Sequence, residues 1–161
     1  MPAAAPSLQA AANRPAVLQK GNSKQMYANG RSAKSSFSSF AGIPRVVMDS
    51  ADYRSLSGSA VKLLNELAYQ YRGKNKNNGN LTVAFAVLKS RGWKSRTTIE
   101  KARNELLAAH LIVCTRQGQF TNPGGTCSLF ALVWAVVDDC PGKGLSISPT
   151  RKPLRLPHEF Q

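Results

Sequence analysis

Lysine and arginine are concentrated in one short part of the chain, and this pattern has the clearest chemical meaning. Between residues 72 and 103 they number nine against a single acid, Glu100, so this stretch has +8 of the protein's formal charge of +14. Any one of these side chains is more often a solvated surface cation than a ligand. Together they neutralise phosphates well, so the cluster predicts a nucleic-acid partner.

A helix expected over residues 95–111 divides its side chains between two faces. At 100° per residue its core face is centred on Ile99, Ala102 and Leu106. The opposite face presents three polar side chains, which we expect at DNA base edges: Thr97, Lys101 and Asn104. Asparagine pairs with adenine, lysine with guanine, and threonine meets the thymine methyl group. Six basic residues in or near the turn, the helix and the following strand are expected at phosphates: Lys89, Arg91, Lys94, Arg96, Arg103 and Arg116.

Three cysteines recur at intervals of thirteen residues, and a histidine precedes the first by four: Cys114, Cys127 and Cys140, with His110. A zinc site is one interpretation, but the close cysteine pairs typical of structural zinc are missing. We favour buried free thiols, because two of the cysteines lie on strands expected to pair. A disulfide between Cys114 and Cys127 is the alternative in an oxidising compartment.

No set of residues predicts catalysis or a cofactor. Asp138 and Asp139 form an isolated acidic pair at a strand end, and the glycines at 124–125 lack the following Lys-Ser/Thr of a phosphate-binding loop. Tyr69 is a conceivable nucleophile for DNA strand transfer, but no pair of histidines or cluster of carboxylates accompanies it to bind a metal. We therefore expect a protein that is not an enzyme and uses neither a cofactor nor a metal.

Three helices and two strands are expected to position these residues. Apolar spacing of 3.6 residues predicts a first helix over 60–71 that ends at Gly73. Thr82 is expected to cap a second helix over 82–91, and Gly92 suits its left-handed end. Ser95 is a good N-cap for the third helix, although residues 97–100 offer a competing capping box.

After the third helix the periodicity changes. The β-branched residues 111–116 predict a strand, and the apolar run 127–137 predicts a second strand beyond a Gly-rich loop. Trp93 and Trp134 are interpreted as core residues rather than base-stacking platforms. The order of elements is typical of a winged helix-turn-helix, an α+β fold that is mainly α, with a three-helix core and a β-hairpin wing.

The chain divides into a central domain and two tails. Residues 1–42 are basic, Ser- and Ala-rich and free of acid, which predicts a flexible arm; an organellar transit peptide has a similar composition. Residues 43–140 form the expected domain, and the Pro-rich residues 141–161 are expected to form a second flexible tail. The longest apolar run has nine residues, and no secretion signal stands at the N-terminus, so we expect a cytoplasmic bacterial protein without membrane contact.

Two segments are distinctive, an Asn-Asn-Gly at 77–79 and an Arg-Gly-Trp-Lys-Ser at 91–95. With residues 43–50, 56–57, 60–71 and 115–118, these segments resemble winged helix-turn-helix proteins of proteobacterial phages, plasmids and integrative elements. The resemblance covers about residues 43–143 and implies DNA binding on a mobile element. It is consistent with a transcriptional regulator or a replication accessory protein. The expected wing of this chain, residues 120–126, is longer than the resemblance implies.

Two other classes of function stay open at this point. One is a protein-interaction module on the same scaffold, such as an element-encoded inhibitor of a host protein, because a fold does not fix a function. The other is an RNA-binding protein, which a charge of +14 also suits. A homodimer is an open alternative as well, although no heptad repeat predicts one.

Overall fold

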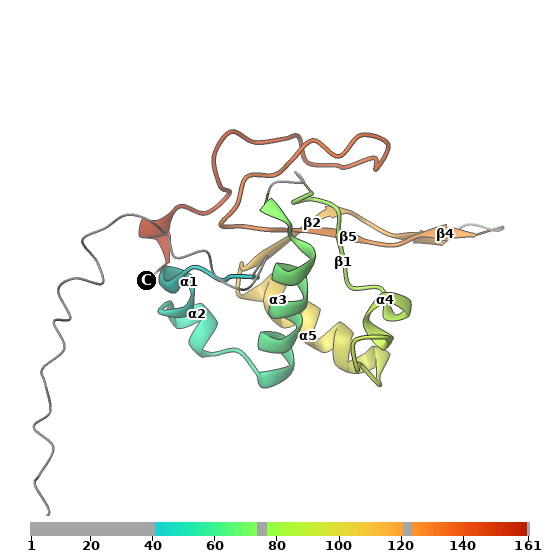
Figure 1. Ribbon diagram of the computed structural model, residues 1–161, viewed down its shortest axis with the longest axis horizontal. Helices are drawn as coiled ribbons and strands as arrows, with labels where there is room; N and C mark the ends of the chain where they lie inside the picture. The colour runs from blue at the N-terminus through green and yellow to red at the C-terminus, as the bar shows by residue number, and fades with distance from the viewer. Residues whose placement is uncertain (1–40, 74–76, 121–123, 161) are drawn as a thin grey trace, which may run out of the picture. The chain divides into compact units, whose positions relative to one another are not determined.

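The helices and strands are short and form a mixed α+β arrangement (Figure 1). A computed structural model describes residues 41–73, 77–120 and 124–160. Its helices are α1 (Arg45–Met48), α2 (Ala51–Arg54), α3 (Gly58–Gln70), α4 (Phe85–Lys89) and α5 (Arg96–Ala108), with a 3-10 turn η2 at Pro157–Glu159. Its strands are β1 (Leu81–Thr82), β2 (Ile112–Arg116), β3 (Gln119–Phe120), β4 (Gly125–Thr126) and β5 (Leu129–Leu132). Of the predicted arm over 1–42, all but the last two residues lie outside the described ranges.

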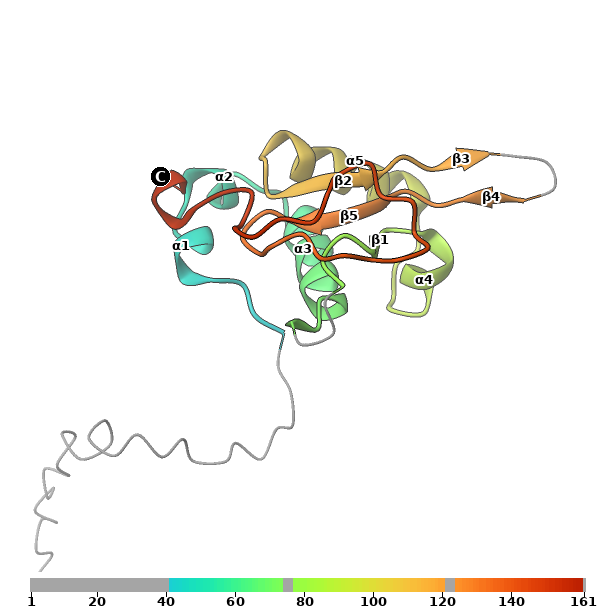
Figure 2. The same ribbon diagram turned by 90° about the horizontal axis from the view of Figure 1, so that it is seen from above.

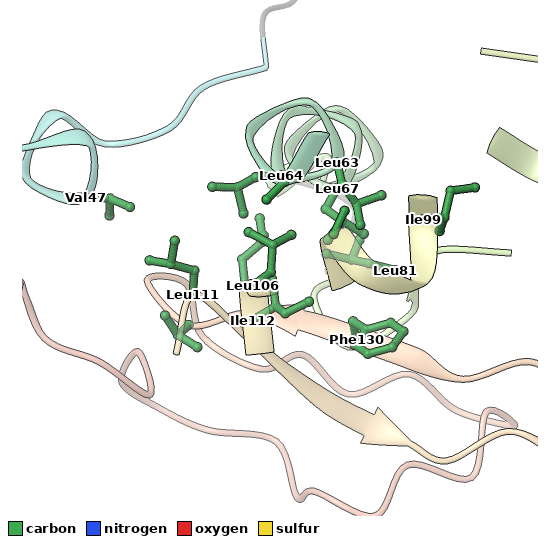
Figure 3. Close-up of a cluster of buried hydrophobic side chains, with 14 of the residues drawn as sticks. Val47, Leu63, Leu64, Leu67, Leu81, Ile99, Leu106, Leu111, Ile112 and Phe130 are labelled. Carbon is green, nitrogen blue, oxygen red and sulfur yellow. The ribbon is translucent and has the colours of Figure 1, made fainter. Parts of the chain in front are cut away.

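Helix α3 forms where the apolar spacing predicts the first helix. The Ser57 hydroxyl caps it by accepting from the N–H of Ala60, which satisfies one of the free amide groups of the first turn. Its buried face includes Leu63, Leu64 and Leu67, which are fully shielded from solvent. These leucines pack against α5 and the sheet, and Figure 3 shows them beside Leu106 and Phe130.

Strands β1, β5 and β2 form an antiparallel sheet in that spatial order. The register places Leu81 opposite Phe130 and Ile112 opposite Leu132, and all four side chains are buried. Helices α3 and α5 lie on one side of this sheet (Figure 1). The sheet and the helices thus share one core, to which α3, α5 and all three strands contribute.

The prediction that Thr82 begins the second helix is wrong. Thr82 lies in β1, paired with Leu129, and α4 begins three residues later at Phe85. The Thr82 hydroxyl does accept a hydrogen bond from the N–H of Ala84, at 3.1 Å. The chain forms a strand here rather than a helix because pairing with β5 buries Leu81 completely in the core.

The prediction of a strand over 127–137 is also too long. Only Leu129–Leu132 pair as β5, and a turn follows at residues 133–134. Trp134 therefore sits in a turn rather than in a strand, although it packs against the core as expected. The chain turns because the side chain of Asn78 binds the carbonyl oxygens of Leu132, Ala135 and Val136, which a continuing strand would direct elsewhere.

The C-terminal segment is not the flexible tail that its proline content predicts. Residues 141–160 have little regular structure, but they pack along the rest of the domain (Figure 2). The Arg155 side chain forms an ion pair with Asp52, at 2.6 Å, and Phe160 is 7% exposed within the core. Three backbone N–H groups donate to carbonyl oxygens at 2.7, 2.9 and 3.0 Å: Ser146 to Thr115, Thr150 to Val137, and Arg155 to Val133.

Replacing Phe160 by alanine tests this packing. We expect a loss of about 2–3 kcal/mol in the free energy of unfolding, because a buried aromatic ring is removed near the chain end. Urea unfolding followed by circular dichroism would measure it. Leu154→Ala is the control, since Leu154 is 42% exposed and should change stability by less than about 0.5 kcal/mol. Equal stability of the two variants would contradict the packing of this segment.

Candidate nucleic-acid interface

A tight turn joins α4 to α5 and sets the direction of α5. Gly92 has a φ of +84°, a left-handed conformation that side chains with a Cβ rarely adopt. The indole of Trp93 follows it into the core, at 5% exposure. The Ser95 hydroxyl then accepts from the N–H of Thr98, at 3.4 Å, and caps α5. The predictions for Gly92, Trp93 and Ser95 are confirmed, and the competing cap two residues later is not used.

Helix α5 separates its side chains by face as the sequence predicts. Ile99, Ala102 and Leu106 are buried, which fixes the rotation of the helix against α3 and the sheet. Its outer face therefore presents three exposed polar side chains, here called the α5 stripe: Thr97, Lys101 and Asn104. The three side chains share one face because they are spaced by four and three residues.

The charges of α5 are distributed unevenly between its faces. The carboxylate of Glu105 accepts from both the backbone N–H and the hydroxyl of Ser57 at the start of α3, so this acid is engaged inside the fold. Glu100 is exposed. Among the cations of the helix, Arg96 and Lys101 are exposed and Arg103 is half-buried, and Glu100 is the one exposed acid beside them.

A groove of about 440 Å³ lies next to α5. Its lining includes Arg96, Glu100 and Arg103 from the helix, and Phe85 and Cys127 from neighbouring segments. The Arg96 guanidinium lies over the Phe85 ring, 5.2 Å from its centroid. The groove thus has two guanidinium groups on its α5 side.

Lys89 and Lys94 are exposed on either side of the turn, where a phosphate can reach them. Arg91, between them, is committed to other contacts. Its guanidinium pairs with the carboxylate of Glu66 and lies 3.9 Å from the centroid of the Tyr69 ring. The hydrogen bond from Arg91 to Glu66 raises the pKa of Arg91 above its ordinary value.

The pairing with Glu66 was not predicted. The two residues lie 25 positions apart, and nothing in the local sequence signals their contact. Arg91 remains partly exposed, but Glu66 neutralises it, so we rank it below Lys89 and Lys94 as a phosphate ligand.

Arg116 is held within the fold. One of its terminal nitrogens donates to the carbonyl of Lys143 at 2.6 Å, and the other donates to the carbonyl of Cys127 at 2.9 Å. These contacts join the end of β2 to the residues after β4 and to the C-terminal segment. Arg116 therefore has a structural role, and we do not include it in the interface.

Strands β3 and β4 form a separate two-stranded ribbon that extends beyond the end of the main sheet (Figure 2). Gly118 lies at its base, where a Cβ atom would come within 2.8 Å of backbone atoms of Thr126 and Ser128. The sequence from 117 to 128 has no charged residue. Any contact of this ribbon with a phosphate must therefore use neutral hydrogen-bonding groups.

The cysteines are less buried than predicted. Cys114 and Cys127 are free thiols, Cys114 half-buried and Cys127 exposed. Cys114 lies opposite Phe130 in the sheet rather than opposite Cys127. Within the described ranges, no three His, Cys, Asp or Glu side chains gather as a metal site would require.

Comparison with protein-family models, curated proteins and solved structures finds no match to this chain. The candidate interface therefore depends on the chain's own residues and their geometry. The longest helices, α3 and α5, have 13 residues each, whereas a span of the bilayer needs about 20. In the part of the chain that the structure describes, no helix is long and apolar enough to cross a membrane.

Proposed function

We propose that this protein is a non-enzymatic, sequence-specific double-stranded DNA-binding protein with a winged helix-turn-helix domain. The order of elements supports this fold: α3, β1, α4, a tight turn and α5 are followed by β2, a projecting ribbon and β5. In the sheet, β5 lies between β1 and β2. This order results when β2 and β5 pair as a hairpin and the short strand β1 pairs with the other edge of β5. In this proposal α4 and α5 are the helix-turn-helix and the β3–β4 ribbon is the wing.

The observation that most favours DNA is the α5 stripe. Its three side chains are exposed on a helix whose opposite face is anchored by three buried residues, so the fold fixes the face of the helix that carries them. In a helix-turn-helix the second helix enters the major groove, where amide, ammonium and hydroxyl groups distinguish base pairs. We assign base contacts to Thr97, Lys101 and Asn104.

Phosphate contacts are assigned to cations around that helix. Three cations are exposed at the turn and at the start of α5: Lys89, Lys94 and Arg96. There they would flank the major groove of the bound DNA. Each phosphate neutralised releases counterions, so affinity must fall as salt rises. With these three phosphate contacts the logarithm of the association constant should fall by roughly 2.7 for each tenfold rise in salt.

The biological setting follows from the resemblance to helix-turn-helix proteins of mobile elements. We propose a role as a transcriptional regulator or replication accessory protein of a bacterial phage, plasmid or integrative element. Both roles need a protein that recognises a site in the element's own DNA.

The experiment is binding of the purified full-length protein to labelled fragments from its genetic neighbourhood. It is run with and without excess random duplex, at low and moderate salt. A shifted fragment that survives the competitor supports the proposal. Binding that is abolished by competitor on every fragment would leave only sequence-independent charge and would count against it.

A second candidate is a protein-interaction module, and one surface favours it. Tyr69 and Val87 are large apolar side chains that are 52% and 43% exposed. The Arg91 guanidinium lies over the Tyr69 ring, 3.9 Å from its centroid, and Val87 is on α4. Tyrosine and arginine are common at protein interfaces. Capture of a partner that is lost in Tyr69→Ala, but kept in a variant without the α5 stripe, would support this role.

A further inference from the structure

Arg103 and Asn104 form a hydrogen-bonded pair on α5. Nε and Nη2 of Arg103 lie 3.1 and 2.9 Å from Oδ1 of Asn104. A guanidinium group only donates hydrogen bonds, so the amide atom that faces it must be the oxygen. The orientation of the Asn104 amide is therefore set by its neighbour.

This contact limits what Asn104 can offer to a base. To read adenine, an asparagine needs Oδ1 to accept from N6 and Nδ2 to donate to N7. Oδ1 has two lone pairs, and the two Arg103 nitrogens use both of them. The groups left over are the Nδ2 hydrogens of Asn104 and the remaining hydrogens of Arg103, all of which are donors.

We propose that Arg103 and Asn104 act as one unit that selects guanine in the major groove. Guanine presents two acceptors there, N7 and O6, whereas adenine presents one acceptor and one donor. A unit with donors only matches guanine and would place a donor against the N6 group of adenine. This inference depends on the proposed function, because it specifies the base that the proposed DNA-reading helix prefers.

The surroundings of the pair favour the same base. Lys101, three residues before Asn104 in the α5 stripe, has an ammonium group that also only donates. Arg103 is half-buried beside the groove that it lines with Arg96 and Glu100, so its guanidinium has less freedom than a fully solvated one. Exposing Oδ1 of Asn104 to a base would require the Arg103 guanidinium to move away and give up both of its hydrogen bonds to that oxygen.

The test is a selection of bound sequences from duplexes with a randomised centre, using the full-length protein. The base position read by the pair is the one whose preference is relaxed in Asn104→Ala. At that position we expect wild-type protein to enrich guanine. Arg103→Met frees Oδ1 while keeping an unbranched apolar stem that reaches as far as Nε, so the preference should move toward adenine. The guanine-to-adenine ratio should change by about tenfold to a hundredfold.

Arg96→Met is the matched control, because Arg96 is on the same helix but lies over Phe85. It should weaken binding to all sequences alike and keep guanine at the same position. Enrichment of adenine by wild-type protein, or of guanine by Arg103→Met, would overturn the inference while leaving the proposed function intact. Absence of any enriched sequence would instead overturn the proposed function, and the inference with it.

Discussion

Replacing Lys101 and Asn104 together by alanine is expected to remove most of the sequence-specific affinity for DNA. Each side chain is exposed on the outer face of α5, and a well-formed contact to a base edge contributes roughly 1–3 kcal/mol. We expect a combined loss of about 3 kcal/mol, or roughly a hundredfold. Affinity for random duplex should fall much less, since only one positive charge is removed. Fluorescence anisotropy with the selected site and with random duplex would measure both.

The chain offers a closely matched control on α3. Lys62 and Asn65 are the same residue types with the same spacing, and both are exposed. The side chain of Asn65 donates to the carbonyl of Val61 in its own helix, at 2.9 Å. Lys62→Ala with Asn65→Ala should therefore change specific binding by less than about threefold. Equal losses in the two double variants would mean that affinity depends on overall charge rather than on α5.

Replacing Asn78 by alanine is expected to produce the largest loss of stability. Asn78 is completely buried, and its side-chain amide donates to the carbonyl oxygens of Leu132, Ala135 and Val136 at 2.9, 3.2 and 2.9 Å. Its Oδ1 accepts from the N–H of Leu132 at 2.8 Å. Alanine would remove all four of these hydrogen bonds. We expect a loss of about 3–5 kcal/mol in the free energy of unfolding, measured in urea.

Two further variants separate hydrogen bonding from simple loss of volume. Asn78→Asp keeps the size of the side chain but turns an oxygen toward carbonyl oxygens, so it should be at least as destabilising as alanine. Asn77→Ala is the neighbouring control, since Asn77 is half-buried and its side chain bonds to the backbone of Gln70 and Arg72. It should cost about 1 kcal/mol. A stable Asn78→Asp variant would show that these hydrogen bonds do not hold the turn after β5.

Local signals made α3 and α5 predictable, whereas the short helices α1 and α2 were not predicted. The apolar spacing of α3, the left-handed Gly92 and the cap at Ser95 each act within a few residues, so the sequence alone locates the turn and the faces of α5. The exposure of Thr97, Lys101 and Asn104 follows from that spacing. These features do not depend on contacts with distant parts of the chain.

The features that the sequence did not reveal depend on distant contacts. Asn78 lies in a polar run that looks like an ordinary loop, yet it binds backbone groups 54 to 58 residues away. Strand β1 has two residues, which is too short for an alternating pattern. The sequence suggests that Arg116 is a free surface cation, because the carbonyl groups that it binds come close to it only in the folded chain. Proline content suggested a flexible C-terminus, whereas Phe160 anchors it in the core.

We propose that α5 reads bases in the major groove. Methylation interference on a fragment that survives competition tests this claim, because dimethyl sulfate modifies guanine at N7 and adenine at N3. Guanine N7 lies in the major groove and adenine N3 in the minor groove. We predict that N7-methylated guanines within the site are excluded from the bound fraction. Exclusion of N3-methylated adenines alone, with methylated guanines fully tolerated, would contradict the claim.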